Sequence, residues 1–132
     1  MNAGKKRILI VDDDADYLEA VSLFLTAHHF TVLKARTGEE GVKLAKMERP
    51  DLILMDIMMG ERTEGFFTIQ QMRREEELRN VPIFVVSSLC TELPEFPIPP
   101  DGGWAAHDLF LPKPLDMAEL LEKVRQRVGE AG

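Results

Sequence analysis

Short apolar runs alternate with amphipathic segments along the chain. The runs at residues 8–11, 52–55 and 83–86 are apolar throughout, as is typical of parallel strands covered on both faces. With two further short segments, the pattern predicts strands at residues 7–11, 31–35, 51–55, 83–86 and 109–111. Because helical patterns separate these strands, the sequence predicts an α/β fold with a parallel sheet.

Helical spacing and caps define the segments between the strands. Leu18, Val21 and Leu25 share one face of the first predicted helix, Thr37 and Glu40 form a capping box for the second, and Asp116 with Glu119 caps the last. The third helix is predicted at about residues 66–78, and its charged run at 73–77 is expected to be mostly solvated. The sequence therefore predicts four helices.

The segment at residues 91–103 interrupts the alternation. It contains Pro94, Pro97, Pro99 and Pro100, each of which removes a backbone donor and fixes φ, so a regular helix is not expected there. The segment is predicted to be a loop, either a surface insertion or a docking segment for a partner.

Length and charge narrow the class of protein. The chain has 132 residues and is predicted to form a single domain, residues 1–132, with its core at about 6–128. Its formal net charge of -7 argues against a nucleic-acid surface. Because no apolar run approaches the length of a membrane span and a single cysteine excludes an internal disulfide, we expect a cytoplasmic protein without membrane insertion.

Acidic residues follow two of the apolar runs. Asp12 and Asp13 come directly after the first predicted strand, and Asp56 follows the third. Ligand sites in open parallel sheets lie outside the carboxyl ends of the strands, so these three side chains can converge. Clustered carboxylates repel one another unless a cation joins them, and oxygen ligands without histidine or cysteine suit Mg²⁺, with Mn²⁺ as an alternative.

A hydroxyl and a lysine follow the other strands. Ser87 comes after the fourth strand, where its hydroxyl can bond a phosphoryl oxygen, and Lys113 follows the fifth, where its ammonium can neutralise one. Taken singly, each residue has a plainer interpretation: a helix-capping aspartate, the role expected of Asp14, a buried hydroxyl or a solvated cation. Their joint occurrence at successive strand ends favours phosphoryl transfer to a carboxylate.

The motifs that carry these residues resemble the receiver domain of two-component response regulators. ILIVDDD, DLILMDIMM, PIFVVSS and FLPKP are similar to that family's motifs, and the resemblance extends over roughly residues 6–128. It implies a flavodoxin-like, doubly wound, five-stranded parallel sheet in the order 2-1-3-4-5. In this chain the fourth helix of that fold would be shortened or replaced by the proline-rich loop.

The resemblance also implies a role for each site residue. Asp56 corresponds to the phosphoacceptor, and Asp12 and Asp13 to the acidic pair that holds Mg²⁺. The Met58 backbone carbonyl would be a further metal ligand, Ser87 the switch hydroxyl, Lys113 the phosphate-contacting lysine, and Phe110 the aromatic switch residue.

The expected function is that of a stand-alone phosphoacceptor. It would take a phosphoryl group from a histidine kinase or histidine phosphotransfer protein. We expect no DNA-binding or enzymatic output domain, so it would signal by binding a downstream protein. One alternative is a receiver-like binding module that is not phosphorylated. Another is a haloacid-dehalogenase-like phosphotransferase, in which Asp12 would be the nucleophile and Asp14 the acid.

Overall fold

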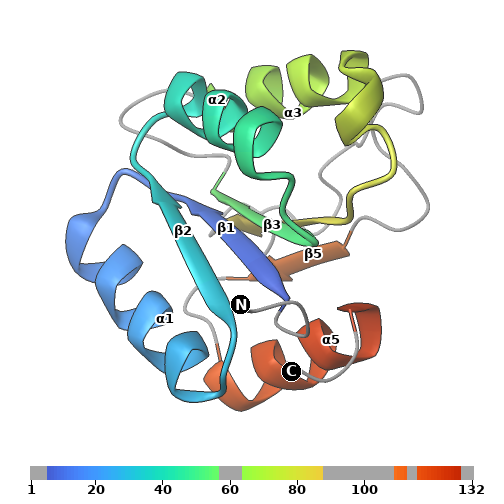
Figure 1. Cartoon of the computed structure of the whole chain (residues 1–132). Coiled ribbons are helices and arrows are strands. Elements are labelled where there is room, and N and C mark those ends of the chain that lie inside the picture. Colours follow the sequence, from blue (N-terminus) through green and yellow to red (C-terminus); the bar gives the residue numbers. More distant parts are fainter. Residues whose placement is uncertain (1–5, 57–63, 88–108, 113–115, 129–132) are drawn as a thin grey trace.

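A five-stranded parallel sheet forms the centre of the protein (Figure 1). The computed structural model describes residues 6–56, 64–87, 109–112 and 116–128, with the backbone alone for residues 64–67, 87 and 109–112. The strand order is β2-β1-β3-β4-β5, as the family resemblance implies. The strands are β1 (Arg7–Val11), β2 (Thr31–Ala35), β3 (Leu52–Asp56), β4 (Ile83–Ser87) and β5 (Leu109–Pro112).

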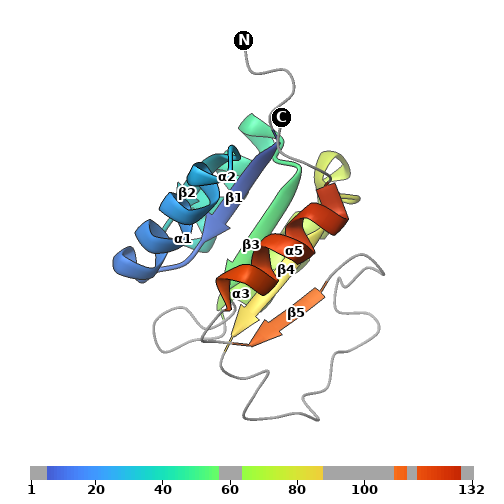
Figure 2. The same ribbon diagram turned by 90° about the horizontal axis from the view of Figure 1, so that it is seen from below.

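Helices cover both faces of the sheet. α1 (Ala15–Ala27) and α5 (Met117–Val128) lie on one face, and α2 (Gly38–Glu48) and α3 (Glu64–Arg74) lie on the other (Figures 1 and 2). A short 3₁₀ helix, η1 (Glu76–Leu78), follows α3. No helix among residues 6–56, 64–87 and 116–128 combines the length and apolar character needed to cross a membrane.

The central strands feed two hydrophobic cores. Successive side chains of a strand point to opposite faces, so Ile8 and Ile10 pack under α1 and α5, whereas Leu9 and Val11 pack under α2 and α3. This explains why β1 is apolar at every position from 8 to 11. The predicted inward residues Leu18, Val21 and Leu25 of α1 are buried in the first of these cores.

The predicted helix caps are present, with one difference. Asp14 and Asp116 accept hydrogen bonds from the first backbone N–H groups of α1 and α5, and Thr37 Oγ1 accepts one from Glu40 N at 3.1 Å. A capping box would return the Glu40 side chain to the Thr37 N–H. Instead, Glu40 Oε1 accepts from Arg36 N at 2.8 Å, one residue earlier.

The prediction of one continuous third helix at residues 66–78 is wrong. α3 ends at Arg74, and Glu75 has an extended backbone, with φ -84° and ψ 123°, before η1 begins. A physical reason is that residues 75–77 are all glutamates, and negative charge at a helix C-terminus opposes the helix dipole. The charged run at residues 73–77 is mostly exposed, as predicted, although Arg73 is half-buried and its Nη1 donates to the carbonyls of Leu78, Arg79 and Val81.

Strand boundaries differ slightly from the sequence prediction. β3 begins at Leu52 and includes Asp56, whereas residues 51–55 were expected. Asp51 precedes the strand and its carboxylate accepts from Arg7 N at 2.8 Å. β4 and β5 each extend one residue beyond the prediction, to Ser87 and Pro112. The expected loss of the fourth helix concerns residues 91–103, which lie outside the described residues.

Candidate metal centre

Strand register brings the three predicted carboxylates together. Val11 of β1 pairs with Met55 of β3, so the residues that follow them, Asp12 and Asp56, lie side by side at the carboxyl edge of the sheet. A carboxylate oxygen from each of Asp12, Asp13 and Asp56 lies within 4.8 Å of the others. The convergence predicted from the sequence is therefore confirmed.

Two of these carboxylates are buried. Asp12 is 1% exposed and Asp56 is 5% exposed. Asp12 Oδ1 accepts a hydrogen bond from Asp14 N at 2.9 Å, which fixes the side chain across the turn that enters α1. Because burial weakens solvent screening of like charges, bringing these carboxylates together costs free energy that a bound cation can offset.

The donor set fits Mg²⁺. Octahedral Mg²⁺ has ligand oxygens at about 2.1 Å from the metal, so adjacent ligands lie about 3 Å apart and opposite ligands about 4.2 Å apart. The three oxygens lie within 4.8 Å of one another, so one ion could contact all three if the side chains moved closer together. All three ligands are hard oxygens, so Mg²⁺ or Mn²⁺ suits them better than a softer metal.

The turn between β2 and α2 contacts the acidic loop. Asp12 N donates to the carbonyl oxygen of Ala35 at 3.0 Å, and Arg36 Nη2 donates to the carbonyl oxygen of Asp13 at 3.3 Å. Arg36 was not among the site residues predicted from the sequence. The available signal was its place directly after β2, because β2 pairs with β1 and so ends beside the acids.

Tyr17 is a second residue near the site that was not predicted from the sequence. Burial, followed by the charges of Asp12 and Asp56, raises the pKa of the Tyr17 phenol well above its ordinary value of 10.0. The phenol is therefore neutral at physiological pH and can act as a hydrogen-bond donor. Helical side chains lean toward the helix N-terminus, so a first-turn position in α1 was the signal that could have found it.

The remaining predicted site residues are only partly described. Ser87 is the last residue of β4, and its backbone pairs with that of Pro112 in β5. Since Asp56 pairs with Val86, the Ser87 backbone lies at the same edge as the acids. Phe110 lies within β5 as a backbone position. Met58 and Lys113 lie outside the described residues.

A comparison with known protein families identifies the family of this chain. The model of the response regulator receiver domain matches residues 8–125. The chain belongs to this family. It is a receiver domain of two-component signalling, as the sequence motifs indicated, and the fold and family predictions are confirmed.

Individual relatives agree with this assignment. Protein PilH of Pseudomonas aeruginosa is 36% identical over 122 residues, which cover 89% of this chain and 93% of PilH. The DNA-binding dual master transcriptional regulator RpaA of Synechocystis is 34% identical over 119 residues, 90% of this chain but 47% of RpaA. This receiver domain therefore spans about half the length of RpaA and nearly all of PilH.

Solved structures show the same fold. The receiver domain of the sensor histidine kinase PA1611 of Pseudomonas aeruginosa, solved with a magnesium ion coordinated in its active site cleft, has a TM-score of 0.79. It is 23% identical, and the match covers 96% of this chain and 99% of that domain.

Proposed function

We propose that this receiver domain accepts a phosphoryl group on Asp56, with Asp12 and Asp13 holding Mg²⁺. The observation that carries the proposal is the cluster of three carboxylates, one from each of Asp12, Asp13 and Asp56, at the carboxyl edge of the sheet. The magnesium ion in the active site cleft of the PA1611 receiver domain supports the choice of metal. The Met58 carbonyl as a further ligand and the roles of Ser87, Lys113 and Phe110 rest on the family motifs.

The proposed reaction transfers a phosphoryl group from a phosphohistidine. A carboxylate oxygen of Asp56 forms a bond to phosphorus while the bond between phosphorus and the imidazole nitrogen breaks, and the imidazole leaves with the electron pair. When bound, Mg²⁺ supplies positive charge against the carboxylates and the phosphoryl oxygens. The position of Asp56 is well defined because it ends a strand that is buried along its whole length.

The outer surface of α1 supports a protein as the phosphodonor. Ala20, Leu23 and Ala27 are all exposed and follow one another at helical spacing, and the Leu23 side chain is 62% exposed. α1 begins three residues after Asp12, so a domain that docks along this surface can bring its histidine to the carboxyl edge of the sheet. We infer that a histidine kinase or histidine phosphotransfer protein docks here.

We also propose that the output is binding to a further protein in the cytoplasm, without a catalytic activity beyond phosphorylation and dephosphorylation of Asp56. The family is a signalling family. The net charge of -7 disfavours direct contact with nucleic acid by this domain.

Labelling with a small phosphodonor tests the acceptor. Purified protein incubated with acetyl phosphate and Mg²⁺ should gain one phosphoryl group, mapped to Asp56 by mass spectrometry, and EDTA should prevent the gain. Absence of labelling with Mg²⁺ present would favour the binding module that is not phosphorylated. Labelling of Asp12 would favour the haloacid-dehalogenase type of chemistry.

A second experiment tests the protein donor separately. Leu23→Asp should slow phosphotransfer from a phosphorylated histidine-containing domain at least about tenfold, because it places charge in an apolar contact, and leave labelling by acetyl phosphate unchanged. Met47→Asp is the matched control, since Met47 is 67% exposed on α2, on the other face of the sheet. Equal slowing by both variants would rule out α1 as the docking surface.

A further inference from the structure

We propose that Arg36 is a positioning residue for the metal centre: its guanidinium holds the main chain of the acidic loop so that Asp13 faces Asp12 and Asp56. The inference rests on the proposed Mg²⁺ site and adds a residue from the β2–α2 turn to it. Neither the family motifs nor the carboxylate cluster itself includes this arginine.

The acidic loop is attached to the β2–α2 turn at two successive residues. The Asp12 N–H donates to the Ala35 carbonyl at 3.0 Å and extends the β1–β2 ladder by one bond. One residue further along both segments, Arg36 Nη2 donates to the Asp13 carbonyl at 3.3 Å. At Asp13 the β1–β2 ladder has ended and the chain turns toward α1. At this position the Asp13 carbonyl accepts from the Arg36 side chain.

Arg36 is itself held in place from the helix side. Its backbone N–H donates to Glu40 Oε1 at 2.8 Å, and Glu40 N donates to Thr37 Oγ1 at 3.1 Å, so the turn is tied to the first turn of α2. The Ala35 carbonyl is bonded to Asp12 and the Arg36 N–H is bonded to Glu40, so the main chain from which the guanidinium extends is held on both sides. The Glu40 carboxylate thus accepts from the Arg36 N–H, whereas in a usual capping box it would accept from the Thr37 N–H.

Two effects of Arg36 on cation binding oppose each other. Its positive charge near the cluster repels Mg²⁺, whereas its hydrogen bond keeps the Asp13 main chain in the conformation that presents a ligand. Arg36 is exposed, so water and salt screen the repulsion strongly. The hydrogen bond acts on the geometry of the loop and is not weakened by salt to the same extent. The geometric effect should therefore dominate, and removal of the side chain should weaken binding.

The sign of the change in affinity tests this directly. Mg²⁺ binding is measured by isothermal titration calorimetry on the whole chain, at fixed pH and 150 mM salt, for the wild type, Arg36→Gln, Arg36→Lys and Arg127→Gln. Arg127 is an exposed arginine in the last turn of α5, so its variant makes the same change in net charge elsewhere. We expect a Kd for Arg36→Gln about two- to fivefold higher than the wild type, partial recovery in Arg36→Lys, and no change in Arg127→Gln.

Other outcomes overturn the proposal. An unchanged or lower Kd for Arg36→Gln would mean that the arginine acts only as a charge or has no effect. A change that accompanies a drop in urea midpoint and is not recovered by Arg36→Lys would mean that the residue supports the fold and does not position the loop. If the wild type bound no Mg²⁺ at all, the proposed metal site would fail as well, whereas normal wild-type binding with an unaffected variant refutes only the role of Arg36.

Discussion

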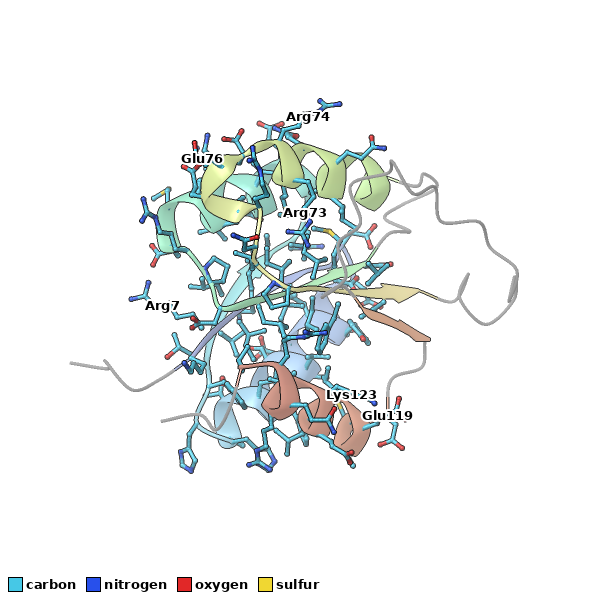
Figure 3. All side chains as sticks on the ribbon, turned by 90° about the vertical axis from the view of Figure 1, so that its right-hand side faces the viewer. Arg7, Arg73, Arg74, Glu76, Glu119 and Lys123 are labelled. Atoms are coloured by element: carbon cyan, nitrogen blue, oxygen red, sulfur yellow. The ribbon has the colours of Figure 1, made fainter. Side chains whose placement is uncertain are left out.

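Charged residues are arranged differently at the amino edge of the sheet, where the strands begin, and at the carboxyl edge, where they end. Arg7 lies at the amino edge (Figure 3). Its Nη1 donates to the Glu48 carbonyl at 2.9 Å and lies 3.4 Å from the Glu48 carboxylate, and Asp51 accepts from the Arg7 N–H. At the carboxyl edge, three carboxylates lie within 4.8 Å of one another. The amino edge pairs charges to join elements, whereas the carboxyl edge gathers like charges. An arrangement that costs free energy in the unliganded state is a reason to expect a ligand.

Arginine side chains extend this contrast. Arg73, at the end of α3, points toward the loop before β4 and donates to three backbone carbonyls, while Arg74 points away from the molecule (Figure 3). Near the acids, Arg36 contacts a backbone carbonyl of the site itself. Arg7 and Arg73 thus stabilise connections between elements, whereas Arg36 contacts the acidic loop of the site.

The largest expected difference between the edges is in phosphorylation. Asp56→Asn should abolish labelling by acetyl phosphate, because an amide lacks the nucleophilic carboxylate. Asp51→Asn makes the same substitution at the amino edge and should leave the extent of labelling unchanged. Phosphate incorporation followed by intact-protein mass spectrometry measures both. Labelling of the Asp56 variant at the wild-type level would show that Asp56 is not the phosphoacceptor.

The second contrast is between two neighbouring arginines. Arg73→Met should lower the free energy of unfolding by about 2 kcal/mol, because three carbonyls lose a charged donor, whereas Arg74→Met should change it by less than about 0.5 kcal/mol. Urea unfolding followed by circular dichroism measures the difference. Neither variant should alter the extent of phosphorylation. Equal effects of the two substitutions on stability would show that the carbonyl contacts of Arg73 contribute little.

The third prediction concerns the sign of a stability change. In EDTA, Asp56→Asn should raise the free energy of unfolding by about 1 kcal/mol, since it removes one of three clustered charges. Asp51→Asn should lower it slightly, because that carboxylate accepts from a backbone N–H. Saturating Mg²⁺ should stabilise the wild type more than the Asp56 variant. A loss of stability in Asp56→Asn without Mg²⁺ would contradict the view that the cluster is strained.

The smallest predicted effect is at alkaline pH. The pKa of Tyr17 is higher in the folded protein than its ordinary value of 10.0, so the folded state holds this proton more tightly than the unfolded state. Tyr17 should therefore not change the pH dependence of stability below about pH 9, and stability should fall as the pH rises above 10. Urea midpoints of the wild type and Tyr17→Phe, compared between pH 8 and 11, measure this. The phenylalanine variant should lose less stability, and identical pH profiles would contradict the prediction.

The sequence by itself determined the order of elements and the position of the acids. β1 and β2 have the predicted bounds, and the caps at Asp14, Thr37 and Asp116 were readable, because strand alternation and capping depend on residues close together in the chain. The convergence of Asp12 and Asp56 was also predictable, since parallel strands place their carboxyl ends at one edge.

Only the tertiary structure decided which long side chains reach across elements. Arg36 contacts Asp13 because β2 is the neighbour of β1 and ends in register with it, and Arg73 contacts the loop before β4 because the chain leaves the helix at Glu75. Helical spacing from the buried Ile69 places Arg73 nearer the core than Arg74, and the position of Arg36 after β2 places it beside β1, but neither pattern identifies the carbonyl that each guanidinium contacts. The partners of Arg36 and Arg73 lie five or more residues away in the chain. Which backbone carbonyl comes within reach of such a long side chain depends on how the sheet and helices pack together.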